Sequence, residues 1–261
     1  MGLMSGKNVV IFGVANKRSI AWGIAQALHR EGARLALNYQ NERMEEPVRK
    51  LAADLPGDTF LAPCDVTVPG DIDRFFARLA KEFGPLDGLV HSIAFAKREE
   101  LGGHFADTSW EGYAMAQQVS AWSLIGLVKG ALPLMEGREA GVVCLSYYGA
   151  EKVVQNYNVM GVAKAALESS TRYLANDVGP RGVRVNAICP GVVVSELHTA
   201  TGAVADYPAF LERARSTHPL GRPGQPEEIA ALAAFLISDE AGWITGGLHA
   251  IDGGRTLTSL R

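Results

Sequence analysis

The chain has few cysteines and histidines, and neither residue type forms a recognisable site. The three cysteines, Cys64, Cys144 and Cys189, lie far apart and form no CxxC pair, and the six histidines show no HExxH or HxH spacing. Sparse, unpaired cysteines are typical of a reducing compartment, and metal sites use short, fixed ligand spacings. We therefore expect no disulfide framework, no metal site and a cytoplasmic location.

Strong net charge and long apolar runs are also missing. A net charge of −3 gives no electrostatic reason to bind nucleic acid or an anionic membrane surface. The first apolar run, Val9 to Phe12, is too short for a membrane span or a signal-peptide core. We expect neither a nucleic-acid partner nor membrane insertion. The hydrophobic share, 48% of 261 residues, is nevertheless enough for a sizeable core.

Short apolar runs alternate with stretches of helical periodicity along the chain. Continuous apolar runs predict strands buried on both faces, and the helices between them predict crossover connections. We therefore predict a single α/β domain, residues 1–261, built on one doubly wound parallel sheet with helices on both faces. The expected strands are Asn8–Phe12, Arg34–Asn38, Thr59–Ala62, Leu86–Val90, Gly141–Leu145, Val183–Ile188 and Gly247–Ile251. The expected helices are Ile20–Arg30, Glu42–Leu55, Ile72–Phe83, Trp110–Met135, Tyr157–Asp177 and one that follows Pro226.

The first predicted strand leads through a glycine turn into a helix. Gly13 begins the turn, and Ser19 and Ile20 stand where the helix starts. The backbone N–H groups and the dipole at such a helix start favour the pyrophosphate of a dinucleotide. Ser19 could cap the helix and also reach a phosphate. The segment is not GxGxxG, so an ordinary turn with a capped helix explains it equally well.

Polar residues follow the second and third predicted strands, where dinucleotide-binding folds place the adenosine. Gln40 is neutral and can bond a ribose 2′-hydroxyl, whereas the neighbouring Arg43 would suit a 2′-phosphate. On balance, this combination favours NADH over NADPH. Asp65 can accept a hydrogen bond from the adenine amino group, or simply cap the next turn. The small residues of His91–Ala96, after the fourth strand, would let a cofactor approach the backbone.

A tyrosine and a lysine carry the clearest catalytic pattern. Tyr157 and Lys164 are seven positions apart, which places both on one face of the predicted helix. A nearby ammonium favours the anion of a phenol, so the pair could polarise a carbonyl and stabilise an enolate. Lys164 could also bond the nicotinamide ribose. Taken alone, the spacing is equally compatible with a solvated helix face.

Together with Tyr147, this pattern resembles the enoyl-[acyl-carrier-protein] reductases of the short-chain dehydrogenase/reductase superfamily. Most of that superfamily carries tyrosine and lysine four positions apart, but Gly161 stands four positions after Tyr157 here. The enoyl reductases instead have Tyr-x6-Lys with a second tyrosine ten positions upstream. Tyr147, Tyr157 and Lys164 match this pattern. The resemblance covers nearly the whole chain, including Gly13–Gly23, Tyr39–Asn41, Cys64–Val66, His91–Ile93, Val183–Ile188 and Asp252–Gly254.

The resemblance implies a Rossmann-like reductase that uses NADH to reduce the double bond of trans-2-enoyl thioesters on acyl carrier protein, in fatty acid elongation. It also implies a homotetramer. Tyr157 would bond the thioester carbonyl, Lys164 would hold the nicotinamide ribose, and Tyr147 would line the acyl site and assist. The residues implied to contact NADH are Gly13, Ser19, Ile20, Gln40, Asp65, Val66, Ile93, Lys164, Val193, Val194, Ser195, Glu196 and Leu197. Those implied to contact the substrate are Ala96, Tyr147, Tyr157, Val204, Tyr207 and Phe210.

Residues 197–219 have the weakest pattern and are expected to form a small helical lid over the substrate. Val204, Tyr207 and Phe210 have helical spacing and could line an acyl tunnel, although a helix face packed on the core would show the same spacing. Docking of an acidic carrier protein would favour a basic segment, and this segment is not basic. The stretch Ser195–Leu197 also departs from the family, which tends to have a Thr-Leu pair without a carboxylate there.

Two other functions remain open. A carbonyl reductase of the same superfamily would act on 3-oxoacyl thioesters, because fold alone does not fix function. Gly161, at the usual lysine position of such enzymes, argues against it. A non-catalytic dinucleotide-binding sensor would keep the glycine turn but would need neither Tyr147 nor Tyr157.

Overall fold

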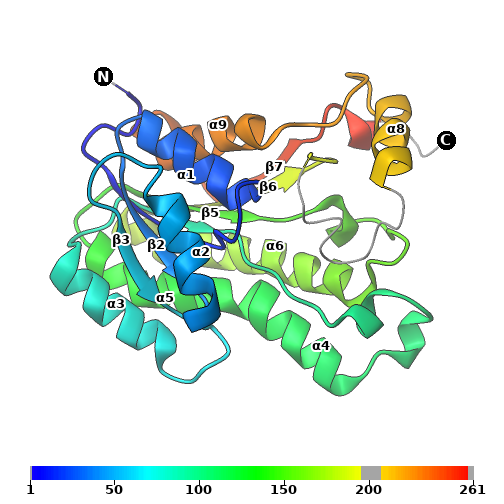
Figure 1. Ribbon diagram of the computed structural model, residues 1–261, viewed down its shortest axis with the longest axis horizontal. Helices are drawn as coiled ribbons and strands as arrows, with labels where there is room; N and C mark the ends of the chain where they lie inside the picture. Colours follow the sequence, from blue (N-terminus) through cyan, green and yellow to red (C-terminus); the bar gives the residue numbers. More distant parts are fainter. Residues whose placement is uncertain (1, 195–206, 258–261) are drawn as a thin grey trace.

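The computed structural model describes residues 2–194 and 207–257. It contains the strands β1 (Asn8–Phe12), β2 (Arg34–Tyr39), β3 (Phe60–Pro63), β4 (Gly88–His91), β5 (Ala140–Leu145), β6 (Val183–Pro190) and β7 (Leu248–Ile251). These strands form one parallel sheet in the order β3-β2-β1-β4-β5-β6-β7 (Figure 1), which confirms the prediction of a doubly wound parallel sheet. The order reverses between β1 and β4, and open sheets of this kind bind ligands at that switch point, beyond the carboxyl ends of the strands.

Helices pack on both faces of the sheet (Figure 1). One face carries α1 (Ile20–Arg30), α2 (Glu42–Ala52) and α9 (Pro226–Ile237). The other face carries α3 (Asp71–Glu82), α5 (Ser123–Met135) and α6 (Asn158–Val178). The described residues also form α4 (Trp110–Gln117), the π-helical turn η3 (Gln118–Trp122) that joins α4 to α5, α8 (Tyr207–Thr217) and several short 3-10 turns.

The local sequence explains where α1 and α9 begin and end. Ser19 caps α1, because its side chain accepts a hydrogen bond from the N–H of Trp22. Gly32 follows α1 with φ 97°, a left-handed conformation that favours glycine. Pro226 begins α9, where its missing N–H costs nothing, and Glu228 in the same turn complements the helix dipole.

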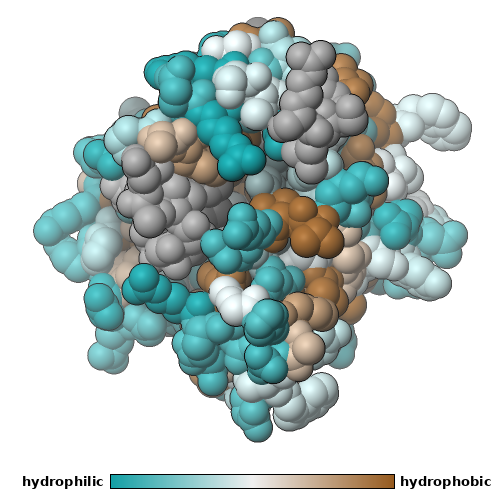
Figure 2. Space-filling model, turned by 90° about the vertical axis from the view of Figure 1, so that its right-hand side faces the viewer, coloured by the Kyte–Doolittle hydropathy of each residue, from teal (hydrophilic) through white to brown (hydrophobic). Residues whose placement is uncertain are grey.

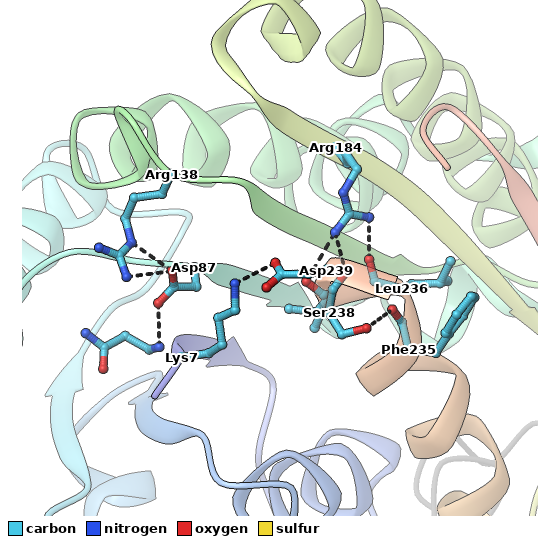
Figure 3. Close-up of polar contacts among 10 residues, drawn as sticks. Lys7, Asp87, Arg138, Arg184, Phe235, Leu236, Ser238 and Asp239 are labelled. Atoms are coloured by element: carbon cyan, nitrogen blue, oxygen red, sulfur yellow. Dashed lines mark hydrogen bonds and ion pairs between the residues drawn. The ribbon is translucent and has the colours of Figure 1, made fainter. Parts of the chain in front are cut away.

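Buried charged groups anchor the amino-terminal edge of the sheet (Figure 3). Asp87 is only 3% exposed and accepts a hydrogen bond of 2.7 Å from Arg138 Nε. Arg184, also buried, donates to the carbonyl oxygens of residues 236–238 at the end of α9. Buried charges are costly unless they are paired, and these are paired within the framework. The edge opposite the switch point is therefore structural.

Two element boundaries differ from the sequence prediction in ways that affect the site. The helix predicted to start at Tyr157 starts at Asn158, and Tyr157 is its N-cap residue with φ −112°. Tyr157 therefore lies at the junction of α6 and the loop before it, seven positions from Lys164. The helix predicted over Trp110–Met135 is interrupted by the π-helical turn. In the part of the chain described, no helix is long and apolar enough to cross a membrane.

Candidate active site

The turn after β1 has the geometry of a phosphate-binding turn. Gly13 has φ 109°, and a Cβ at this position would lie 2.1 Å from the carbonyl oxygen of Ser92, so a larger residue does not fit. The first turn of α1 contains no acidic residue that would offset the positive end of its dipole. A close backbone turn followed by such a helix start can hold a pyrophosphate.

Asn38, which the sequence analysis missed, holds this turn in place. Its side chain is buried in β2, where Oδ1 accepts a hydrogen bond of 3.2 Å from Gly13 N–H and Nδ2 donates at 3.1 Å to the carbonyl oxygen of Cys64. Asn38 therefore links β2 to the residues that directly follow β1 and β3. A lone amide within an apolar strand is the sequence feature that could have identified it, since buried polar groups need partners.

Ser19, Ile20 and Ile93 lie around the same turn. Ser19 Oγ accepts a hydrogen bond of 3.2 Å from Trp22 N–H and donates at 2.9 Å to the carbonyl oxygen of Asn16. Helix capping therefore accounts for Ser19 without a ligand, and its contact with a phosphate stays a prediction. Ile20 and Ile93 are half-buried.

Gln40 and Asp65 meet beyond the ends of β2 and β3. Gln40 Nε2 donates to Asp65 Oδ2 at 2.9 Å, and Thr67 donates to Asp65 Oδ1 from both its N–H and its hydroxyl group. Partial burial would raise the pKa of Asp65, but the hydrogen bonds from Thr67 and Gln40 outweigh it and hold that pKa below its usual value. Asp65 is thus an ionised cap of the following turn, next to the buried Val66.

Tyr147 and Tyr157 form a half-buried aromatic pair beyond the end of β5. Their ring centroids are 5.0 Å apart at an interplanar angle of 68°. A Cβ on Gly149 would lie 2.5 Å from the Tyr157 ring, and a Cβ on Gly161 would lie 2.8 Å from the carbonyl oxygen of Gly149. Gly161, the departure from the usual superfamily spacing, is therefore required by packing around this pair.

The hydrogen bond of Lys164 is not to the Tyr157 phenol. Lys164 Nζ instead donates to the carbonyl oxygen of Leu145 at 2.6 Å. Burial, together with the neighbouring Tyr147, raises the pKa of Tyr157 above its usual value. Burial lowers the pKa of Lys164 to about 8. Lys164 is not among the groups that shift the pKa of Tyr157, so its effect on a phenolate stays a prediction.

The carboxyl end of β4 and the residues after it are bound to the π-helical turn and to the first residue of α5. His91 Nε2 and Ser123 Oγ are 2.8 Å apart, and Phe95 N–H donates to Ser120 Oγ at 3.0 Å. Burial, with a smaller effect of Lys164, lowers the pKa of His91 to about 3 and keeps the ring neutral. Ala96, one of the predicted substrate contacts, is half-buried and packs against an apolar cluster formed by Ala116, Val159 and Ala163.

The remaining predicted site residues are only partly described. Val193 is buried and Val194 N–H donates to the carbonyl oxygen of Gly224 at 3.0 Å. Tyr207 begins α8 and Phe210, in the same helix, is half-buried. The face of the molecule that includes α8 shows apolar side chains near its centre, among polar ones (Figure 2). The predicted contacts Ser195, Glu196, Leu197 and Val204 lie outside the described residues.

Comparisons with known proteins identify relatives over the full length of the chain. The sequence profile described as "Enoyl-(Acyl carrier protein) reductase" matches residues 13–256. The enoyl-[acyl-carrier-protein] reductase (NADH) FabI of Aquifex aeolicus is 46% identical over 254 residues, which are 97% of this chain and 93% of that protein.

Solved structures agree with the sequence comparison. A Bacillus cereus enoyl-acyl carrier protein reductase, crystallised with NADP+ and indole naphthyridinone, is 43% identical and matches with a TM-score of 0.94 over 100% of both chains. The enzyme from Anaplasma phagocytophilum, in complex with NAD, is 39% identical and matches with a TM-score of 0.92 over 100% of this chain and 97% of that one. The profile, the sequences and the structures lead to one conclusion: the chain belongs to the enoyl-(acyl carrier protein) reductase family.

Proposed function

We propose that this protein reduces the carbon–carbon double bond of trans-2-enoyl thioesters carried by acyl carrier protein, with NADH as the reductant, in fatty acid elongation. The observation that carries this proposal is the half-buried Tyr147–Tyr157 pair beyond the end of β5, followed by Lys164 on α6. The resemblance that implies an enoyl reductase rests on the same three residues. The family match supports the same reaction class.

The residues around the switch point fit a dinucleotide. The turn at Gly13 and the start of α1 would hold the pyrophosphate. Gln40 and Asp65 would bind the adenosine, and Lys164 would bond the nicotinamide ribose. Bound NADH supplies the hydride that reduces the β-carbon of the substrate.

The proposed preference for NADH over NADPH rests on charge at the end of β2. Gln40 is hydrogen-bonded to the ionised Asp65, so a negative charge lies next to the expected position of the adenosine ribose. A carboxylate there disfavours a 2′-phosphate, although Arg43 is close in sequence. Fluorescence titration with each cofactor tests this preference, and tighter binding of NADPH would contradict it.

Tyr157 would stabilise the charge that develops on the substrate. Because burial raises its pKa, the Tyr157 hydroxyl keeps its proton near neutral pH and can donate a hydrogen bond to the thioester carbonyl oxygen. That hydrogen bond strengthens as the oxygen becomes an enolate, which is where a preorganised donor in a buried site lowers the barrier most. Tyr147 would pack against Tyr157 and restrict its ring. Lys164, as an ammonium, would orient the ribose.

The acyl chain would lie between Ala96 and the predicted lid at residues 197–219. Val204, Tyr207 and Phe210 are the residues that we propose to line this side, by resemblance to the family. α8 occupies the second half of the segment and carries Arg213 and Arg215 on its exposed surface. Glu212 is paired with Arg215 at 2.7 Å, so α8 offers an acidic carrier protein little net positive charge.

We also propose that the protein is a cytoplasmic homotetramer. Trp110, Trp122 and Ile125, in the α4–α5 region, are 74%, 50% and 40% exposed. Large exposed apolar side chains are frequent on surfaces that bind another chain. Light scattering after size-exclusion chromatography measures the assembly directly, and a monomer at micromolar concentration would contradict the proposal.

The test of the activity is the loss of reduced-nicotinamide absorbance with two substrates in parallel. A trans-2-enoyl thioester should be reduced, and a 3-oxoacyl thioester should not. Turnover of the 3-oxoacyl substrate alone would favour a carbonyl reductase. Binding of NADH without turnover of any thioester would favour a dinucleotide-binding sensor.

A further inference from the structure

The inner face of α6 is unusually polar for a helix that packs against a sheet. Lys164, Glu168 and Thr171 follow one another at intervals of four and three residues, and all three are buried. This spacing places them on one stripe of the helix. Thr171 Oγ1 lies 3.2 Å from Cys144 Sγ of β5, so the stripe faces the sheet. Buried charged groups are costly unless they are compensated, so both charges in this stripe require an explanation.

Glu168 and Lys164 together hold the chain segment that enters the active site. The carboxylate of Glu168 accepts a hydrogen bond of 2.5 Å from Ser146 Oγ. One helical turn earlier, Lys164 Nζ donates to the carbonyl oxygen of Leu145 at 2.6 Å. Leu145 and Ser146 lead directly into Tyr147, so two side chains of α6 fix the main chain before the aromatic pair.

Glu168 also acts electrostatically on Lys164. The groups that act on Lys164 come from four elements: His91 of β4, Cys144 of β5, Cys189 of β6 and Glu168 of α6 itself. His91 stays neutral because burial lowers its pKa to about 3. Burial raises the pKa of Cys144 to about 11 and that of Cys189 to about 12, so both thiols keep their protons near neutral pH. The Glu168 carboxyl group, one helical turn from Lys164, is the remaining acidic group that acts on it.

We propose that Glu168 is a positioning residue: its buried carboxylate balances the Lys164 ammonium and, through Ser146, fixes the main chain that enters Tyr147. This inference rests on the proposed function, in which Lys164 holds the nicotinamide ribose. The Ser146 hydroxyl and the Cys189 thiol both donate to Glu168, so its carboxyl group is an acceptor toward β6 and the residue that follows β5. Glu168 acts on the reaction through Lys164 and Tyr147.

The first experiment measures NADH affinity by fluorescence from neutral to alkaline pH. Glu168→Gln keeps the shape and an acceptor oxygen for Ser146 but removes the charge. Without the carboxylate, Lys164 loses its proton at lower pH, so the alkaline decline in affinity should move down by on the order of one pH unit. The control Asp177→Asn removes an exposed carboxylate from the same helix and should leave the pH of this decline unchanged. An unmoved decline in Glu168→Gln would overturn the proposal.

The second experiment is a double-mutant cycle of thermal unfolding, which requires no activity. Lys164→Met and Glu168→Gln each leave one buried charge without its partner, whereas the double variant leaves neither. The loss of Tm in the double variant should therefore be smaller than the sum of the two single losses. Additive losses would overturn the proposal, as would a double variant that does not fold. If the wild type binds NADH but reduces no enoyl thioester, the proposed function fails while this cycle still decides the role of Glu168.

Discussion

Two regions on the same face of the sheet are built in opposite ways. Next to α3, an aromatic cluster is packed edge to face and tilted, with ring centroids 5.1 Å apart for Phe12 and Phe75 and 5.3 Å apart for Phe75 and Phe76. Next to α6, the buried stripe of Lys164 and Glu168 carries charge. The aromatic cluster consists of Phe12, Phe60, Phe75, Phe76 and Phe83.

We expect the aromatic cluster to contribute mainly to stability and the polar stripe mainly to the reaction. Apolar rings stabilise the fold in proportion to the area they bury and need only neighbours of the right shape. Buried polar groups contribute little net stability and need a specific partner for each atom. A substitution in the aromatic cluster should therefore lower the free energy of unfolding, and one beside the polar stripe should lower turnover.

The largest effect on stability is expected from Phe75→Ala. The side chain is 2% exposed and contacts three other rings, so its loss leaves a cavity and should cost about 3–5 kcal/mol of unfolding free energy. Urea denaturation measures this cost, and Phe105→Ala, at a position 51% exposed, is the control, with a change of about 0.5 kcal/mol or less. Folded Phe75→Ala should keep its turnover number. A large loss of turnover in the folded fraction would break the comparison.

Tyr157→Phe should have the reverse effect. Removal of the hydroxyl deletes the donor to the developing enolate, so turnover should fall by about 10²–10³-fold. Stability should change little, because the ring and its contact with Tyr147 remain. Steady-state kinetics with a trans-2-enoyl thioester and thermal unfolding measure the two quantities. Tyr173→Phe, at an exposed position of α6, is the control, and undiminished turnover in Tyr157→Phe would remove this hydroxyl from the mechanism.

The sequence was sufficient to predict the fold because its periodicity is a local property. Runs such as Val9–Phe12 and the helix Ile20–Arg30 are specified by residues adjacent in the chain, and the structure contains both. The cofactor end of the sheet was predictable for a related reason. Parallel strands bring their carboxyl ends to one edge, so Gly13, Gln40 and Asp65 could be expected there together from their positions alone.

The polar stripe was not predictable, because its partners are far apart in the sequence. Glu168 meets Ser146 across 22 residues, and Asn38 meets Cys64 across 26 residues. Spacing could not give the ionisation of Tyr157 either, since burial rather than a neighbouring charge is the main cause of its raised pKa. Local patterns indicate which residue types are present at a site, whereas long-range contacts set the protonation states that decide their chemistry.

The polar region should also make stability depend on pH through His91. Its pKa is about 3 in the folded protein, so between that pH and its unfolded value of about 6.5 only the unfolded chain takes up the proton. The stability contributed by the neutral ring is therefore present above about pH 6.5 and is lost as the pH falls, by about 2 kcal/mol between pH 7 and pH 5. Urea denaturation at both pH values measures this loss.

The variant His91→Gln assigns the pH dependence to this residue. It removes the titrating ring while keeping a polar group for Ser123, so the difference in unfolding free energy between the two pH values should shrink. His104→Gln, at an exposed position, is the control and should keep the wild-type difference. An unchanged difference in His91→Gln would mean that the acid sensitivity lies elsewhere, for example in carboxylates such as Asp65.

The smallest effect concerns Ser19, on the other face of the sheet, where stability and cofactor binding overlap. Ser19→Ala loses an N-cap and should cost about 1 kcal/mol of unfolding free energy. Ser109→Ala is the control for the loss of a cap, because Ser109 caps α4 at 3.0 Å from Gly112 N–H; its hydroxyl also donates to the buried Glu100, so its cost in stability should be the larger one. If Ser19 also contacts a phosphate, Ser19→Ala alone should weaken NADH binding in a fluorescence titration. Equal NADH affinity in the two variants would leave Ser19 a cap and nothing more, and would place pyrophosphate binding on the backbone at Gly13 and α1.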